Sequence, residues 1–370
     1  MKPRVTLIAA VACFICAWGA LLLLQHNREV AFSPQYTLRE FARLNNVKPG
    51  KVKSELGMTM LRGRTTLEEL GLDRKRAAGI IAHLRGSFRP GAMAAAQAGF
   101  AAAVCLAMVL LCRRKMSSPV KYILLCIAVI GFGFALGKAF NPMVATVKVG
   151  KCIAGLEGNP AGRLLVLALF VLLAVIGNKA VCGWACPYGA LQELLFKLPV
   201  LRSFKKKHKI PFRFANAVRI CFFILFVAAL CTDLLGFRGR GQALYHVINP
   251  FNLFELNFTL LTVALYIAAT LLVSLVYYRP HCYAVCPFGL VSWLLERASI
   301  FRIRIDREKC TGCGACIKAC PGQAMKGIYE QAALPPDCFS CGECLGTCPA
   351  DALSYTGRPL PAVTAAPAKQ

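Results

Sequence analysis

Eight cysteines near the C-terminus follow a spacing that is typical of iron–sulfur clusters. They form two runs of the type Cys-x2-Cys-x2-Cys-x3-Cys-Pro, one beginning at Cys310 and the other at Cys338. A [4Fe–4S] cluster needs four thiolate ligands, and in paired runs of this type the fourth cysteine of each run binds the other cluster. We therefore expect two clusters, the first held by Cys310, Cys313, Cys316 and Cys348, and the second by Cys338, Cys341, Cys344 and Cys320.

The residues between these cysteines are small, as a tightly curled ligand loop requires. Gly312, Gly314 and Ala315 lie in the first run, and Ser340 and Gly342 lie in the second. Structural zinc is the competing interpretation, but zinc sites usually combine two separated cysteine pairs. Two copies of a four-cysteine run that ends in proline favour iron and sulfur instead.

Four further cysteines form a second repeat. The motif Cys-x3-Cys-Pro occurs at Cys182 and Cys186 in CGWACPYG, and again at Cys282 and Cys286 in CYAVCPFG. The two copies are 100 residues apart, and each is followed by an amphipathic stretch. This pattern indicates an internal duplication, which would relate the two cysteine pairs by a pseudo-twofold axis.

Three interpretations of these four cysteines remain open at the level of sequence. They could be small buried packing residues, redox-active thiol pairs, or a further metal or cluster site with four thiolates. Spacing of i and i+4 allows the two cysteines of each pair to share one helix face.

The composition favours a membrane protein. Of the 370 residues 57% are hydrophobic and only 16% are charged, and the mean hydropathy is +0.56. A bilayer span needs about 20 mainly apolar residues. The segments of this kind are residues 5–24, 91–112, 122–140, 161–178, 214–235 and 258–278.

The predicted fold is therefore an α-helical integral membrane protein with about six transmembrane helices and a C-terminal α+β ferredoxin-like domain. Residues 1–24 are read as a transmembrane anchor, because their apolar run exceeds that of a cleaved signal peptide. The other expected parts are a small helical extracytoplasmic domain (25–90), a membrane domain with the duplicated motifs (91–300), the ferredoxin-like domain (301–355) and a disordered tail (356–370).

Basic residues predict the orientation. The net charge is +27, and the loops that follow the second and fourth segments hold twelve Lys and Arg residues, against four in the two alternate loops. Basic loops face the cytoplasm, so both termini and the clusters are expected on the cytoplasmic side of a bacterial inner membrane. Arg219, one turn into the fifth segment, is read as a snorkelling side chain. No motif for nucleic-acid binding accompanies the positive charge.

Residues 25–90 are expected to form three or four short helices. Leu38, Phe41, Ala42 and Leu44 repeat at helical spacing, and Thr66 with Glu69 has the pattern of a capping box. Asp73 is a candidate N-cap for a last helix.

The four cysteine motifs resemble those of the NapH/NosR-type membrane polyferredoxin family. The resemblance covers about residues 91–355 and rests on CGWACPYG, CYAVCPFG, CTGCGACIKACP and CFSCGECLGTCP. It implies electron transfer between the quinone pool and a dedicated redox partner protein, or support of metalloenzyme maturation. The segment 25–90 is not part of the core of that family.

The resulting hypothesis is an electron-transfer component of an oxidoreductase system, and not a stand-alone catalyst. If quinol is oxidised near the bilayer, a proton-handling group is needed, and the candidates are Lys138, Asp233, His246, Glu255 and His281. The alternatives are a metal (copper) reduction or metalloenzyme maturation factor, and a redox-sensing regulator that signals through residues 25–90. The expected partners are membrane lipid and a redox partner protein, without nucleic acid.

Overall fold

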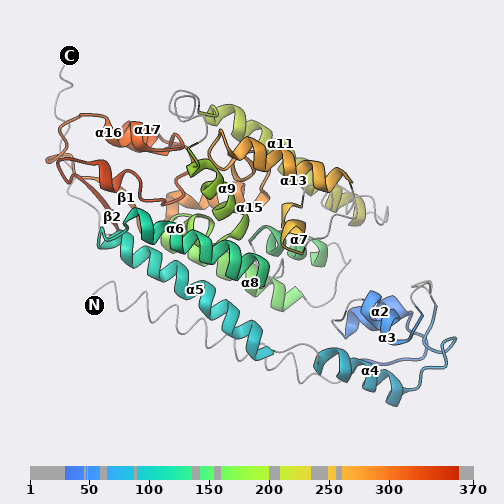
Figure 1. Ribbon diagram of the computed structural model, residues 1–370. Helices are drawn as coiled ribbons and strands as arrows, with labels where there is room; N and C mark the ends of the chain where they lie inside the picture. The colour runs from blue at the N-terminus through green and yellow to red at the C-terminus, as the bar shows by residue number, and fades with distance from the viewer. Residues whose placement is uncertain are drawn as a thin grey trace. The chain divides into compact units, whose positions relative to one another are not determined.

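The structure is a computed structural model, shown in Figure 1. It describes residues 30–45, 47, 49–58, 65–86, 90–135, 142–153, 160–199, 209–234, 249–255 and 261–357. The chain divides into two compact units, one made of Met1–Ala98 with Val147–Val166 and the other of Gly99–Thr146 with Leu167–Gln370. The expected anchor (1–24) and the tail from residue 358 onward lie outside the described residues.

Three short helices within residues 30–86 pack around an apolar core in the first unit. They are α2 (Leu38–Leu44), α3 (Pro49–Glu55) and α4 (Arg74–Gly86). Asp73 caps α4 as predicted, because its Oδ1 accepts the N–H of Arg76 at 2.9 Å. The buried side chains of the core are Leu38, Phe41, Ala42, Val52, Leu67, Leu72, Ala77 and Ile81.

Two details of this unit differ from the expectation. Leu44 is 53% exposed, because it stands six residues after Leu38 and so lies off the helix face that Leu38, Phe41 and Ala42 share. Thr66 and Glu69 exchange the two hydrogen bonds of a capping box, at 3.2 and 3.3 Å. These bonds close a turn over residues 67–71 and do not start a helix.

The described parts of the five later apolar segments are all largely helical. They correspond to α5 (Pro90–Cys112), α6 (Ser118–Ile127) continued by the π-helix η1 (Ala128–Ala135), α8 (Pro160–Gly177), α11 (Phe212–Leu234) and α13 (Leu261–Ser274). Within the described residues, none of the helices reaches the length and hydropathy needed to cross a bilayer. Two shorter elements, α7 (Pro142–Ile153) and the 3-10 helix η4 (Pro250–Glu255), precede α8 and α13 in the chain.

The region after residue 300 has the expected α+β character. Strands β1 (Arg302–Ile305) and β2 (Leu353–Thr356) form an antiparallel pair in which Ile303 lies opposite Tyr355. Between them are α16 (Ala315–Ala319), α17 (Ala324–Tyr329) and the 3-10 helix η6 (Leu345–Thr347), shown in the orange to red part of Figure 1. Because β2 pairs with β1, the segment between them, which contains both cysteine runs, begins and ends at one small sheet.

The ferredoxin-like region is joined to the helical region through the C-terminal end of α8. The last carbonyl groups of a helix have no partner within the helix. Here the N–H groups of Ile300 and Phe301 donate to two of these carbonyls at 2.9 Å. Tyr355 Oη donates to the carbonyl of Gly177 at 2.8 Å, and Ser340 Oγ to that of Asn178 at 2.7 Å. The end of α8 is therefore capped by the segments that carry the clusters.

Candidate iron–sulfur site

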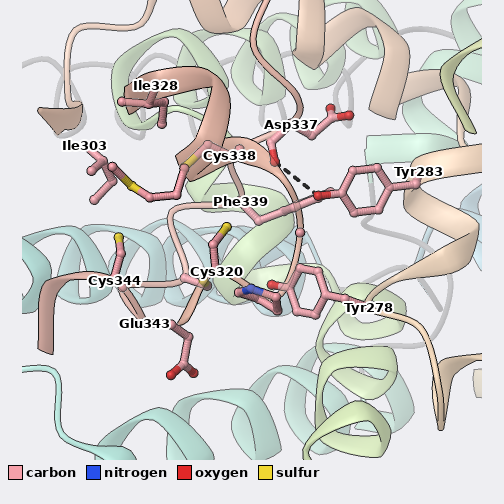
Figure 2. A pocket seen from close by; sticks show the side chains of 16 residues that line it. Tyr278, Tyr283, Ile303, Cys320, Ile328, Asp337, Cys338, Phe339, Glu343 and Cys344 are labelled. Carbon is pink, nitrogen blue, oxygen red and sulfur yellow. Dashed lines mark hydrogen bonds between the residues drawn. The ribbon is translucent and has the colours of Figure 1, made fainter. Parts of the chain in front are cut away.

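Four cysteines line one cavity in the ferredoxin-like region, which Figure 2 shows from close by. The wall contains Ile303, Ile328, Phe339, Tyr278 and Tyr283 among other residues. The cysteines are Cys320 from the first run and Cys338, Cys341 and Cys344 from the second. Four soft sulfur donors around a mostly apolar pocket are the donor set of a [4Fe–4S] cluster.

The thiols of this cavity are strongly desolvated. Burial raises the pKa of Cys341 to about 11, although Lys121 opposes the effect. Burial and then neighbouring thiols, including Cys341 and Cys320, raise the pKa of Cys344 well above its ordinary value. Iron binds the thiolate form, so iron must displace protons from these cysteines when it binds.

The remaining four cysteines of the two runs lie closer to the surface. After burial, the charges of Cys310 and Cys348 are among the causes that raise the pKa of Cys316, which places these three thiols near one another. The fourth, Cys313, is exposed, and a hydrogen bond from the backbone of Ala315 is the largest cause that lowers its pKa. The loop turns at Gly312 and Gly314, whose φ values of 73° and 68° lie in the left-handed region.

The two Cys-x3-Cys-Pro motifs share one local structure. The N–H of Cys186 donates to the carbonyl of Val181 at 2.9 Å, and that of Cys286 donates to His281 at 3.0 Å. Both are bonds from residue i to residue i−5. The two second cysteines have nearly equal backbone angles (φ −69°, ψ 114° and φ −66°, ψ 119°). The repeat in sequence is therefore a repeat in structure.

A proline follows each second cysteine and begins a new helix. These helices are α9 (Pro187–Lys197) and α15 (Pro287–Leu295), and the preceding helical turns are η3 (Val181–Ala185) and α14 (Pro280–Ala284). The two cysteines of a pair therefore do not lie in one continuous helix, although their spacing would have allowed it. Proline lacks an N–H and forces the residue before it out of helical geometry.

The four cysteines of the two motifs converge. Cys182 and Cys282 both raise the pKa of Cys186, after burial. Cys286 is likewise affected by all three of the others, with burial again the largest cause. Cys182, Cys186 and Cys282 are buried. The structure thus brings together two thiol pairs that lie 100 residues apart in the chain.

Gly183, between Cys182 and Cys186, lies against the loop that begins the second cysteine run (residues 337–344), called here the second cluster loop. A Cβ atom at this position would meet the carbonyl oxygen of Phe339 well inside van der Waals contact. We expect Gly183→Ala to force the loop away and to destabilise the protein by about 1–3 kcal/mol, as overpacking does. Thermal unfolding followed by the visible absorbance of the clusters measures this effect.

Gly346→Ala is the matched control, because a Cβ on Gly346 meets nothing within 4 Å. Its unfolding temperature should stay close to that of the wild type. Equal unfolding temperatures for Gly183→Ala and the wild type would contradict the tight contact.

A buried ionic group holds the second cluster loop on one side. The carboxylate of Asp337 contacts Lys179 Nζ, and its two oxygens lie 3.1 Å from the two terminal nitrogens of Arg219. The side chains of Asp337 and Arg219 are fully buried, and that of Lys179 is 1% exposed. The sequence suggested that Arg219 snorkels, and this prediction is wrong. Its side chain points inward, because a buried carboxylate binds it.

A second buried ionic group lies beside the first Cys-x3-Cys-Pro motif. The carboxylate of Glu193 contacts Lys121 at 2.7 Å and Arg279 at 2.6 Å. Burial alone would raise the pKa of Glu193, but the two cations lower it to about 2. Arg279 also donates to the carbonyls of Cys182 and Gly183.

Phe339 connects the two ionic groups. Its ring lies 5.2 Å from Lys179 Nζ and 5.0 Å from Arg279 Cζ, which are cation–π distances. Lys179 and Arg279 each stand three residues before a first motif cysteine, and both have positive φ, at 61° and 49°. The motifs did not single out these two residues. They are 100 residues apart, as the two cysteine motifs are, and this shared spacing is a signal that could have found them.

His281 is the one quinone-linked candidate whose side chain falls within the described residues. It is buried, burial lowers its pKa to about 3, and its Nδ1 bonds to the hydroxyl of Tyr266. His281 is thus neutral and held in place. The side chains of the other candidates, Lys138, Asp233, His246 and Glu255, lie outside the described residues.

No set of three or more His, Cys, Asp and Glu side chains in the described part of the chain is arranged tightly enough for a single metal ion. A [4Fe–4S] cluster binds each thiolate through a different iron atom. Its ligands therefore stand farther apart than those of one ion.

Two family models match the chain. Residues 159–211, which include the first Cys-x3-Cys-Pro motif, match a model described as a 4Fe-4S binding domain. Residues 280–324, which include the second motif and the first cysteine run, match a model described as a 4Fe-4S dicluster domain. The protein binds two [4Fe–4S] clusters.

Curated relatives match less than half of the chain. The chain is 32% identical over 167 residues to the methylamine utilization ferredoxin-type protein MauN of Methylorubrum extorquens, covering 44% of this chain and 54% of that one. It is 28% identical to the ferredoxin-type protein NapH of Haemophilus influenzae, covering 43% and 53%. It is 26% identical to the regulatory protein NosR of Pseudomonas aeruginosa, covering 44% and 23%.

The chain spans about half the length of the first curated relatives it matches. No solved structure matches it significantly. The two family models together cover both Cys-x3-Cys-Pro motifs and the first four-cysteine run. These matches support the resemblance of the chain to the NapH/NosR-type polyferredoxin family.

Proposed function

We propose that this protein is a membrane-bound electron carrier that links the quinone pool to a redox partner protein through its clusters. In this proposal Cys310, Cys313, Cys316 and Cys348 hold the first cluster, and Cys338, Cys341, Cys344 and Cys320 hold the second. Cys182, Cys186, Cys282 and Cys286 form a third thiolate centre. A bound [4Fe–4S] cluster takes up and releases single electrons.

The contact between the thiolate centre and the second cluster loop is the observation that carries the proposal. Gly183 lies between two cysteines of the centre and touches the carbonyl of Phe339, which follows Cys338. Tyr283 follows Cys282, lines the cavity of the second cluster and donates to the carbonyl of Asp337 at 3.2 Å (Figure 2). On both sides the contacting residues are direct neighbours of a cysteine in the chain. An electron therefore has a short path between the thiolate centre and the second cluster.

The buried charges support the same function. Lys179 and Arg279 lie near the four converging cysteines, where they partly oppose the rise of the pKa of Cys182 that burial causes. Positive charges beside a site with four thiolates stabilise its negative charge in a place where water cannot. The chain therefore supplies fixed cations where a thiolate centre would need them.

Exposed apolar side chains support the membrane location. Several helices present large hydrophobic residues outward, which is costly in water and favourable in lipid. They are Ile123, Ile130 and Phe134 on α6 and η1, Ile224 and Leu225 on α11, and Leu261, Leu265 and Leu272 on α13. In this proposal residues 91–300 lie in the bacterial inner membrane, with residues 25–90 outside and both termini and the clusters on the cytoplasmic side.

Cys186→Ser and Cys286→Ser test the third centre. We expect each variant of the anaerobically purified protein to lose part of its iron and to lose reduction of the clusters by a quinol analogue. The paramagnetic signals of the two clusters should persist after chemical reduction, because their eight ligands are untouched. Cys126→Ser, which changes an exposed cysteine of α6, is the matched control. Unchanged iron content and unchanged quinol oxidation in both variants would rule the centre out.

Metal reduction, as in a copper-handling maturation factor, is the second candidate function. The convergence of four thiols, three of them buried, favours it, since soft thiolates bind Cu(I) tightly. Copper titration of the wild type and of Cys186→Ser separates the two functions. Stoichiometric copper binding that the variant abolishes, without any quinol oxidation by the wild type, would favour metal reduction over electron transfer.

A further inference from the structure

A second cavity, next to strand β1, is lined by arginine. It has a volume of about 720 Å³, within the range of small-molecule sites. Its apolar wall includes Trp293, Ile305 and Leu334. Its basic wall consists of Arg297, Arg302, Arg304 and Arg307.

The charges around this cavity do not balance. Glu296 is the one acidic residue among the described residues that line it. Its carboxylate accepts the N–H of Cys338 at 3.1 Å and so faces the cluster loop. Within the described chain, none of the four guanidinium groups forms an ion pair. Four positive charges against at most one negative charge leave a strongly positive cavity.

Arg304 is the most informative of these side chains. Its Nε is buried and has no hydrogen-bond partner among the described residues. Arg302 lies two residues earlier on β1, so both side chains project from the same face of the strand. Their partners across the sheet, Ser354 and Thr356, carry no charge. A buried donor without a partner costs free energy, which a bound acceptor would remove.

We propose that this cavity binds a phosphate-bearing molecule, whose phosphate group is held by Arg302 and Arg304 and whose apolar part lies against Trp293. The planar guanidinium group matches phosphate through two parallel hydrogen bonds. A phosphate monoester can carry two negative charges and so neutralises the cavity better than a carboxylate does. The molecule is either a phospholipid headgroup or a soluble phosphate ester.

The cavity is close to the second cluster. Ile303 and Ile328 line both this cavity and the one that contains Cys320, Cys338, Cys341 and Cys344. A phosphate bound in this cavity would therefore lie near the second cluster. Its negative charge would stabilise the oxidised cluster and shift the reduction potential to a more negative value. The binding itself does not depend on which partner exchanges electrons with the protein.

Calorimetric titration of the full-length holoprotein tests the site with two probes, inorganic pyrophosphate and the short-chain lipid dihexanoyl phosphatidic acid. Tight binding of the first alone indicates a soluble phosphate ester, and tight binding of the second alone indicates a lipid. We expect Arg304→Gln to weaken the binding about tenfold, which corresponds to the loss of one charge-assisted hydrogen bond. Lys326→Gln removes the same charge from an exposed position on α17 and should leave the affinity unchanged.

Arg302→Gln provides a second variant if Arg304→Gln fails to retain its clusters. A shift of the cluster potential upon binding, absent in the arginine variant, gives an independent readout. The proposal is overturned if neither probe binds the wild type, or if the arginine variants bind as the wild type or Lys326→Gln does.

Discussion

Asp337→Ala should lower the free energy of unfolding by about 3–5 kcal/mol. The substitution leaves the buried cations Lys179 and Arg219 without their carboxylate partner. Removing one member of a buried ionic group strands the others in a medium that cannot solvate them. The unfolding temperature should fall, and the second cluster should be lost first, because Asp337 precedes Cys338 in the chain. Thermal scans monitored at the cluster absorbance, with iron analysis of the folded fraction, measure both effects.

Asp351→Ala is the matched control for this prediction. Asp351 also pairs with an arginine, Arg114, but its side chain is 79% exposed. Exposed ion pairs contribute about 0–1 kcal/mol, so this variant should unfold almost as the wild type does. If the two aspartate variants lost equal stability, burial would not be what makes Asp337 important.

Cys320→Ser should remove the second cluster, although Cys320 belongs to the first run in the sequence. Cys320 lines the cavity together with Cys338, Cys341 and Cys344. Loss of one thiolate leaves an iron atom without its protein ligand. The variant should lose about half of the iron bound by the eight cysteines. The paramagnetic signal of the reduced protein should change from that of two interacting clusters to that of a single one.

Two further variants identify which cluster is lost. Cys320→Ser should resemble Cys341→Ser, in the second run, in its residual spectrum and reduction potential. It should differ from Cys313→Ser, which affects the other cluster. A spectrum of Cys320→Ser that matches Cys313→Ser would show that each run binds its own cluster, contrary to the assignment.

The sequence by itself predicted the parts of the site that depend on short distances along the chain. The spacing of the cysteines in each run indicates the type of cluster, since three ligands within seven residues can bind three corners of it. The residue types also predict the local geometry, with glycines at positive φ in the first ligand loop and helices that begin at Pro187 and Pro287. The apolar segments from residue 91 onward likewise correspond to helices.

Only the tertiary structure decided which distant residues meet. The sequence left open whether Cys182 and Cys186 act alone, and the fold brings them to Cys282 and Cys286. Nothing near Asp337 in the chain predicts that it binds Lys179, in the turn after α8, and Arg219, on α11. The arginine cavity is equally invisible in a list of basic residues. A charge buried among helices must find its partner wherever packing places one, and packing is not encoded in local spacing.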